Sequence, residues 1–240
     1  AADAASWVSA PAPPSLGGRR RVLVLGASGN VGQATLHWIV QSDASGACEI
    51  LAGARDPHAL ATPRGVRAVR AEMTSGPDEV EGAPPPEWMR GLDVLVIITP
   101  GNDERVPATL RTARQAAAAG VAQLIVVSVS TAELADSIFG KQFEEIERGV
   151  AAVAAASSSA LHFTIVRLPL FLENYYGFAQ SVRENDAIRC AVDPAARYSP
   201  IAVTDVGEAL AALATDTSGA HLGATLSLAG ASHTFGEVAA

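Results

Sequence analysis

The sequence has few cysteines and few aromatic residues, and it lacks long apolar runs and clustered histidines. Its two cysteines, Cys48 and Cys190, lie far apart and have no metal-ligand spacing, so we expect reduced thiols in a reducing compartment rather than a disulfide framework. The five histidines do not pair at metal-ligand spacing either, and we therefore expect no metal. No apolar run approaches the roughly 20 residues that are needed to cross a bilayer, which predicts that the chain has no membrane span.

Positive charge is also scarce. The net charge is −8, and the one basic run is Arg19–Arg21, which we expect to be solvated beside the first strand. A nucleic-acid-binding surface needs a basic stripe, so no nucleic-acid partner is expected. The 240 residues are 49% hydrophobic, which is enough to bury a large core. These features predict a single enzyme-sized domain with a small-molecule substrate.

The first 18 residues differ from the rest of the chain. They are small, rich in proline and poor in charge, and they end in a Gly-Gly pair. We expect residues 1–18 to form a flexible N-terminal arm. Two interpretations of the arm stay open: a cytoplasmic protein with a flexible extension, or the remainder of an organelle transit peptide. The arm lacks the arginines that transit peptides usually carry, which weighs against the second.

The most informative segment is VLVLGASGNVGQATL at residues 22–36. Its apolar start, Val22–Leu25, is typical of a strand that is buried on both faces of a parallel sheet. Gly26 can adopt the backbone angles of a tight turn, Gly29 leaves room for a diphosphate, and Gly32 lets the next helix pack closely on the strand. That helix would direct its free N–H groups at the diphosphate. The segment therefore predicts a dinucleotide-binding strand, turn and helix, with GxxGxxG spacing in place of the commoner GxGxxG.

The residues after the second expected strand indicate which dinucleotide binds. NAD-binding folds place a carboxylate there for the ribose hydroxyls, about 20 residues beyond the glycines. This sequence instead has Arg55 directly after Glu49–Ala54. A guanidinium makes bidentate hydrogen bonds to phosphate, which favours NADP over NAD. Two alternatives stay open: Arg55 pairs with Asp56 in solvent, or Asp56 is a displaced ribose ligand.

Short apolar strands alternate with helical stretches along the chain, which is the pattern of a doubly wound parallel α/β sheet. We expect helices at about 104–119 and 139–157, the first of them capped by Asn102 and Asp103. Three consecutive prolines make residues 73–90 a loop insertion that leads into a short helix. The expected strands are Val22–Leu25, Glu49–Ala52, Val66–Val69, Val94–Thr99, Gln123–Ser128, Phe163–Arg167 and Thr225–Leu228.

Seven segments carry a resemblance to a known family. They are VLVLGASGNVG at 22–32, ARDP at 54–57, VLVIITP at 94–100, IVVSVS at 125–130, FGKQFEEIE at 139–147, HFTIVRLPLFLENYYG at 162–177 and IAVTDVGEAL at 201–210. Together they resemble the NmrA-like family of atypical short-chain dehydrogenase/reductases. That family includes NADPH-dependent quinone reductases, isoflavone-reductase-like enzymes and regulators that bind NADP or NAD without clear turnover.

The resemblance implies a Rossmann fold. Residues 19–170 would form the NAD(P)-binding part, and residues 171–240 a small C-terminal substrate-side lobe together with the final sheet strand, within the same domain. The implied cofactor contacts are Gly26, Ser28, Gly29, Asn30, Val31 and Gly32 at the diphosphate, Arg55 at the 2′-phosphate, Thr99 and Pro100 at the ribose and nicotinamide, and Pro169, Leu170 and Phe171 at the nicotinamide.

The catalytic pair of the wider superfamily is incomplete in this sequence. In short-chain dehydrogenases a Tyr four residues before a Lys supplies the acid, and the Lys also binds the nicotinamide ribose. Lys141 stands at the Lys position, but Ser137 occupies the Tyr position, and a serine hydroxyl is too weak an acid to replace a tuned phenol. Lys141 and Ser128 are the candidate catalytic residues. The alternatives are that Lys141 is solvated and that Ser128, like Ser130, only satisfies nearby backbone groups.

We therefore expect an NADP(H)-binding oxidoreductase that passes hydride from NADPH to a quinone or a small carbonyl acceptor. The missing Tyr favours a quinone, because the reduced quinone oxygen is a better-stabilised anion than an alkoxide. Two phenols that follow the nicotinamide loop, Tyr175 and Tyr176, either replace the missing acid or pack in the core. The alternative functions are a regulator that senses NADP(H) and contacts a protein partner, and an assembly or scaffold factor. No oligomeric state is predicted.

Overall fold

The computed structural model describes residues 18–239 except 44, 75–84, 135–136, 158–160 and 190. Residues 1–17 of the expected arm, Cys190 and residues 75–84 of the expected loop insertion lie outside this part of the chain. The other expected elements fall within it.

A seven-stranded parallel sheet forms the centre of the molecule, in the order β3-β2-β1-β4-β5-β6-β8. Every neighbouring pair in it is parallel. This order confirms the doubly wound Rossmann fold, with the chain reversing its direction across the sheet between β1 and β4. All seven expected strands are present: β1 (Arg20–Leu25), β2 (Cys48–Ala54), β3 (Val66–Arg70), β4 (Val94–Ile97), β5 (Gln123–Val129), β6 (His162–Leu168) and β8 (Thr225–Ser227).

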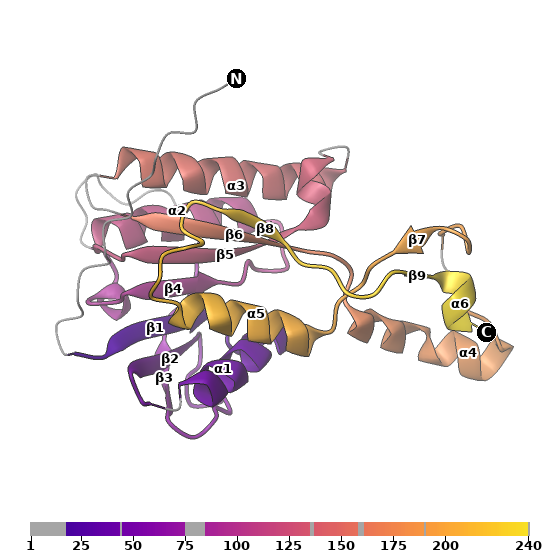
Figure 1. The fold of residues 1–240 in the computed structure, drawn as a ribbon, viewed down its shortest axis with the longest axis horizontal. Helices are drawn as coiled ribbons and strands as arrows, with labels where there is room; N and C mark the ends of the chain where they lie inside the picture. Colours follow the sequence, from indigo (N-terminus) through magenta and orange to yellow (C-terminus); the bar gives the residue numbers. More distant parts are fainter. Residues whose placement is uncertain are drawn as a thin grey trace.

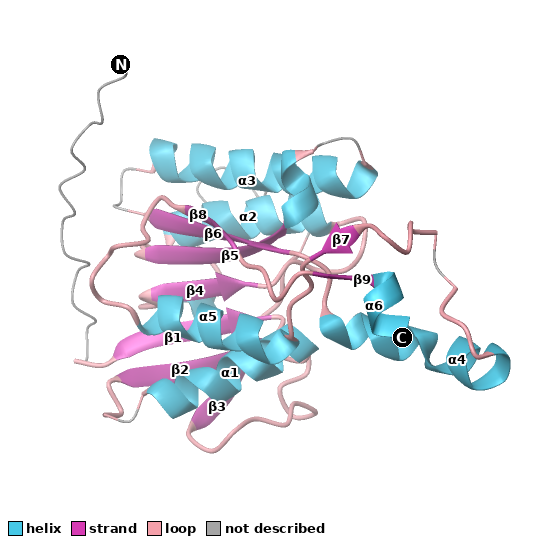
Figure 2. Ribbon diagram, turned by 45° about the vertical axis from the view of Figure 1, so that its right-hand side comes forward, coloured by secondary structure: helices cyan, strands magenta, loops and turns pink. Residues whose placement is uncertain are grey.

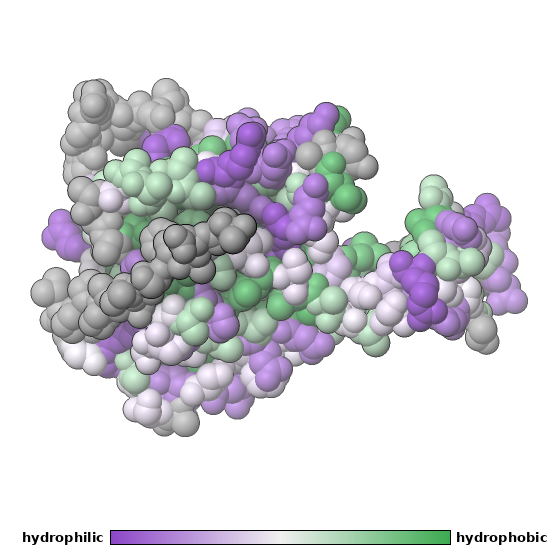
Figure 3. All heavy atoms as spheres, turned by 45° about the horizontal axis from the view of Figure 1, so that its top comes forward, coloured by the Kyte–Doolittle hydropathy of each residue, from purple (hydrophilic) through white to green (hydrophobic). Residues whose placement is uncertain are grey.

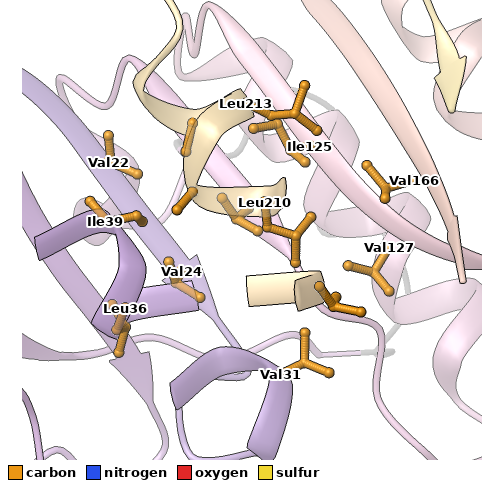
Figure 4. Close-up of a cluster of buried hydrophobic side chains, with 14 of the residues drawn as sticks. Val22, Val24, Val31, Leu36, Ile39, Ile125, Val127, Val166, Leu210 and Leu213 are labelled. Atoms are coloured by element: carbon orange, nitrogen blue, oxygen red, sulfur yellow. The ribbon is translucent and has the colours of Figure 1, made fainter. Parts of the chain in front are cut away.

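Two pairs of helices cover the two faces of the sheet (Figures 1 and 2). Helices α1 (Asn30–Ser42) and α5 (Val203–Thr215) pack together on one face, and α2 (Arg105–Ala118) and α3 (Ile138–Ala156) pack together on the other. Each face has its own apolar core, because the central strands are apolar at nearly every position and bury side chains in both directions. Figure 4 shows the first core, in which Leu210 and Leu213 of α5 point at the strands.

A small lobe lies beyond one end of the sheet (Figure 1). The chain enters it directly after β6, returns to the main body for α5 and β8, and then enters the lobe a second time. In the space-filling view the lobe stands clear of the main body, with apolar side chains on both sides of the junction (Figure 3). Its elements are η3 (Leu172–Phe178), α4 (Ala179–Asn185), β7 (Arg197–Tyr198), β9 (His233–Thr234) and α6 (Phe235–Ala239).

The two predicted helices, α2 and α3, agree with the expectation in extent, and the N-terminal cap of α2 differs from it. Helix α2 begins after Glu104 with no side-chain cap, so the expected capping by Asn102 and Asp103 is wrong; Asn102 instead accepts the Arg105 N–H through its backbone carbonyl. Two further short helices are η1 (Glu87–Met89), which ends the loop insertion, and η2 (Ser130–Glu133). None of the helices in the described residues is both long and apolar enough to cross a membrane.

The basic run before the glycine motif is not solvated as expected. Arg20 and Arg21 belong to β1, and their side chains bond to residues of other strands, Arg21 to the adjacent β2 and Arg20 to β5, which lies beyond β4. Nη2 of Arg20 donates to Oε1 of Gln123 at 2.9 Å, and Nε of Arg21 donates to Glu49 at 2.8 Å. The hydrogen bond from Arg67 and the charge of Arg21 hold the pKa of Glu49 below its usual value. The run therefore ties the beginnings of the strands together.

Close packing of α5 against α1 depends on Gly207. A Cβ atom at this position would lie 2.5 Å from the carbonyl carbon of Ala34 and 2.8 Å from its oxygen, both backbone atoms of α1. We expect Gly207→Ala to lower the free energy of unfolding by about 1–3 kcal/mol, although alanine favours a helix intrinsically. Chemical denaturation checks this, with Gly177→Ala as the control, because a Cβ there would meet nothing within 4 Å. Equal stability of Gly207→Ala and the wild type would contradict the packing argument.

Candidate functional site

The three glycines of the motif have three different surroundings. Gly26 has a φ of 81°, which a side chain strains, and its Cβ would lie 3.1 Å from Cβ of Ile98. Gly32 is in closer contact, because a Cβ there would lie 2.3 Å from the carbonyl oxygen of Gly26. At Gly29 the nearest protein atom would be 3.5 Å away, which is ordinary contact. The fold itself therefore requires Gly26 and Gly32, whereas at Gly29 it leaves space that a ligand can use.

The first turn of α1 is open to an anion. Gly29 is its N-cap, no side chain caps the turn, and no acidic residue lies within it. Ser28, Gly29 and Asn30 are exposed, while Val31 and Gly32 are buried. The free N–H groups and the helix dipole together attract a phosphate at such a terminus, and the bare Gly29 lets it approach. These residues fit the diphosphate of a dinucleotide.

Arg55 lies at the carboxyl end of β2, directly after Ala54, and its side chain is exposed. Among the residues that the structure describes, it makes no ion pair. Asp56 does not engage it; its carboxylate instead accepts the backbone N–H of His58 at 3.0 Å. The guanidinium is therefore available to a ligand at the edge of the sheet.

A cavity of about 490 Å³ opens at the carboxyl ends of β4, β5 and β6. It brings together candidate residues from segments far apart in the sequence. Those that line it are Val31, Thr99, Pro100, Ser128, Ser130, Pro169, Leu170 and Phe171, joined by Ile98, Gly101, Arg105, Val127, Val129, Thr131, Phe139, Phe143, Leu168 and Asn174. Ligands of open α/β folds bind at this edge of the sheet, at the point where the strand order reverses.

Ser128 is completely buried at the base of this cavity. Its hydroxyl donates to Oε1 of Glu147 on α3 at 2.5 Å, and Glu147 receives two further hydrogen bonds, of 2.9 and 2.7 Å, from the guanidinium of Arg167. Arg167 also pairs with Glu133. The paired carboxylates raise the pKa of Arg167, so it keeps its charge. The network fixes the serine in one orientation.

Lys141 does not line the cavity. It lies in the first turn of α3 with its side chain exposed. Ser137, at the position of the superfamily's Tyr, is the N-cap of α3, and its hydroxyl accepts the N–H of Gly140 at 2.9 Å. That serine therefore has a structural role in starting the helix.

The two phenols after the nicotinamide loop have different positions. Tyr175 packs in the lobe, where its hydroxyl contacts the hydroxyl of Tyr198. The same hydroxyl lies 2.7 Å from Nε2 of His233. Burial raises the pKa of Tyr175 above its usual value, which weakens it as an acid. Tyr176 is 81% exposed, and neither phenol lines the cavity.

Two neighbours of these tyrosines have roles of their own. The carboxylate of Glu173 accepts the N–H of Val203 at 3.0 and 3.1 Å and so caps α5, whereas Asn174 lines the cavity. Cys48 is buried and free, and burial raises the pKa of its thiol, so it is a poor nucleophile. No group of three or more potential metal ligands occurs among the described residues.

One cavity residue escaped the sequence analysis. Arg105 lies at the start of α2 and is 92% buried, since its exposed fraction is 8%. In the sequence it follows Asp103 and Glu104, a context that is typical of a solvated helix start. Only the fold brings it to the cavity.

Residues 26–217 match the family described as NAD(P)H-binding. The chain belongs to this family. The structures that resemble it include an NADPH-dependent quinone oxidoreductase of Escherichia coli in complex with NADPH, with a TM-score of 0.72 and 21% identity over 90% of this chain and 72% of that one. They also include a triphenylmethane reductase of Citrobacter sp. in complex with NADP(H), with a TM-score of 0.70 and 16% identity over 91% and 73%. At these identities the likeness shows a shared fold.

A curated relative is more similar in sequence. It is the (4-alkanoyl-5-oxo-2,5-dihydrofuran-3-yl)methyl phosphate reductase of Streptomyces griseus, 29% identical over 212 residues, which cover 87% of this chain and 67% of the relative. The family match and these neighbours confirm the resemblance to the atypical, NmrA-like dehydrogenase/reductases. A nicotinamide dinucleotide is therefore the cofactor of the family to which this chain belongs.

Substitution of Gly29 should separate binding from folding. We expect Gly29→Ala to weaken NADPH binding by about tenfold or more, because its Cβ enters the space left for the diphosphate. The cost in stability should stay near 0.5–1 kcal/mol, the penalty of alanine at an N-cap. NADPH fluorescence and thermal melting measure the two effects.

Gly29→Ser is the matched variant, because serine restores a capping hydroxyl and still adds a Cβ. It should bind NADPH as weakly as the alanine variant while melting at least as high as the wild type. Unchanged NADPH affinity in both variants would place the diphosphate elsewhere.

Proposed function

We propose that the protein is an NADPH-dependent reductase that transfers hydride to a quinone or a small carbonyl acceptor. The observation that carries the proposal is the cavity itself. Val31 of the glycine turn, the loop Pro169–Phe171 and the end of β5 line one space of about 490 Å³. An enzyme needs such an open apolar pocket beside the nicotinamide, whereas a protein that only binds the dinucleotide does not.

In the proposal, different residues bind different parts of the cofactor. When bound, NADPH supplies a hydride from C4 of its nicotinamide. The first turn of α1 binds the diphosphate, Arg55 binds the 2′-phosphate, and Thr99 and Pro100 lie along the ribose. Pro169, Leu170 and Phe171 form an apolar wall that excludes water from the reacting atoms.

The cavity offers no tuned acid. Among the described residues that line it there is no Tyr, His, Lys, Cys, Asp or Glu, and the Ser128 hydroxyl already donates to Glu147. Reduction of a ketone needs a proton at the developing alkoxide, but a reduced quinone is a stable anion that takes its proton from water later. This favours a quinone over a ketone.

The similar proteins support the same class of chemistry. The relative from Streptomyces griseus is a reductase, and one of the similar structures is an NADPH-dependent quinone oxidoreductase. The absence of an acid from the cavity lining also fits a regulator that binds NADP(H) without consuming it. Turnover distinguishes the two.

The first test is oxidation of NADPH in the presence of neutral quinones and neutral ketones or aldehydes. We expect quinone-dependent loss of NADPH absorbance, with kcat/KM for quinones about 100-fold or more above that for ketones, the factor that a missing general acid costs. Tight binding of NADPH without oxidation by any acceptor would favour the regulator.

The same assay tests the two candidate catalytic residues. In the proposal Lys141 reaches the nicotinamide ribose from α3, and Ser128, whose one proton is held by Glu147, shapes the acceptor side of the cavity without donating to the acceptor. A Lys141→Ala variant with unchanged KM for NADPH and unchanged kcat would remove Lys141 from the site. Ser128→Ala should lower kcat for quinones, and an unchanged rate would leave Ser128 a structural partner of Glu147.

Preference for NADPH over NADH should depend on Arg55. We expect Arg55→Gln to raise the Kd for NADPH by about 10- to 100-fold, the value of charge-assisted hydrogen bonds, while the Kd for NADH stays the same. Arg64→Gln is the control, because Arg64 is an exposed arginine of the same β2–β3 connection. Equal losses for both dinucleotides, or none, would contradict the assignment of the 2′-phosphate.

A further inference from the structure

The cavity contains a buried cation that the proposed hydride transfer does not use. Arg105 is only 8% exposed, and it lines the cavity from the start of α2. Charged side chains are rarely buried so deeply without a partner, because removal of a charge from water is costly. The surroundings of Arg105 therefore show what it is arranged to bind.

Among the described residues, all the contacts that hold Arg105 are with neutral groups. The guanidinium lies over the ring of Phe139, with its carbon 4.8 Å from the ring centre, and 5.8 Å from that of Phe143. Its Nη1 donates to Oε1 of Gln142 at 2.6 Å, and its Nε donates to the carbonyl oxygen of Pro100 at 3.3 Å. These contacts fix the plane of the guanidinium without neutralising its charge.

The guanidinium of Arg105 retains N–H donors for a ligand. A guanidinium carries five N–H groups. Two of them have acceptors among the described residues, one at Nη1 and one at Nε, which leaves three, including both on Nη2. Planar N–H pairs of this kind match the two oxygens of a carboxylate or a phosphate.

No carboxylate of the described residues balances the charge of Arg105. None lines the cavity. Glu147 and Glu133 are both occupied by Arg167, and Asp103 and Glu104 are exposed residues that form no ion pair with Arg105. Among the described residues, the positive charge in the cavity therefore has no carboxylate opposite it, and the hydroxyl-bearing side chains Ser130 and Thr131 line the same cavity.

The start of α1, which would hold the phosphates of the dinucleotide, packs on the opposite face of the sheet from the α2 and α3 side chains around Arg105. Val31 and the first turn of α1 belong to the core beneath α1 and α5, whereas Phe143 belongs to the core beneath α2 and α3. The cavity spans the edge of the sheet between these two faces. The anion that Arg105 meets must accordingly come from a second ligand, which in the proposed function is the acceptor.

We propose that Arg105 is a substrate-binding residue and that the acceptor carries an anionic group, a carboxylate or a phosphate, which the free N–H groups of Arg105 bind. The proposal rests on the proposed function only for the statement that the second ligand is the acceptor. It assigns the α2 and α3 side of the cavity to the anionic group, and the wall Pro169–Phe171 to the apolar, reacting part.

The test measures binding without turnover. Naphthoate, naphthyl phosphate and neutral naphthamide have similar apolar parts and accept no hydride, and calorimetry of the NADP⁺-loaded protein gives the Kd of each. We expect one of the two anions to bind about tenfold or more tightly than the amide, the value of a charge-assisted hydrogen bond. The tighter anion shows whether the site is built for a carboxylate or a phosphate.

Variants then assign the preference to Arg105. Arg105→Met should abolish it, and Arg105→Lys, which keeps the charge but loses the fork, should retain part of it. Arg114→Met is the control, because it removes one positive charge from an exposed position of the same helix. Preservation of the full preference in Arg105→Met would overturn the proposal, as would equal Kd values for all three ligands in the wild type.

Replacement of a buried arginine frequently causes misfolding. The comparison of charged and neutral ligands in the wild type therefore tests the anion site by itself. Asp136 lies outside the described residues, and the Asp136→Asn variant tests it as a counter-ion. If the wild type shows no preference for the anions and Asp136→Asn does, Asp136 neutralises Arg105 and the proposal is overturned. The preference is measured without hydride transfer. A protein that binds the anions selectively and oxidises no NADPH would refute the reductase and leave this site standing, and the reverse result would refute this site alone.

Discussion

The architecture depends on the close contact between the start of α1 and the turn that follows β1. At Gly32 the helix backbone comes so near the carbonyl oxygen of Gly26 that no side chain fits between them. This contact directs the start of α1 at the edge of the sheet, and α5 then packs on α1 with an equally bare position at Gly207. Two glycine contacts within the protein thereby fix the frame around the predicted dinucleotide site.

Most of the fold could be predicted because its central strands are buried on both faces. An apolar run such as Val94–Ile97 has one plausible structure when glycine turns and amphipathic helices flank it, and so all seven expected strands are present. The lobe was harder. Strands β7 and β9 are two residues each and pair residues far apart in the sequence, Arg197 with Thr234 and Tyr198 with His233. Segments so short carry no periodicity, and only tertiary contacts create them.

The site was predictable where the backbone makes it and less so where side chains do. Gly29 and Arg55 lie where the strand, turn and helix pattern predicts, at the N-cap of α1 and directly after β2, and their contacts with a dinucleotide stay predictions. The cap of α2 and the bonds of Arg20 were missed because they depend on which carbonyl or amide another strand brings near. Arg105 illustrates the same limit, since its neighbours in the sequence are charged and exposed while its neighbours in space are Phe139 and Phe143.

The carboxylate of Glu173 has a wider consequence than the capping of one helix. It holds the first N–H of α5, while the next residue, Asn174, forms part of the acceptor cavity. Because α5 packs on α1, the Glu173 carboxylate and the close contact at Gly207 together join the wall of the cavity to the helix that starts at the glycine turn. In the proposed reductase, the separation between hydride donor and acceptor would then be a dimension of the folded frame, set before either ligand binds, and little binding energy would be needed to bring the reacting atoms into register.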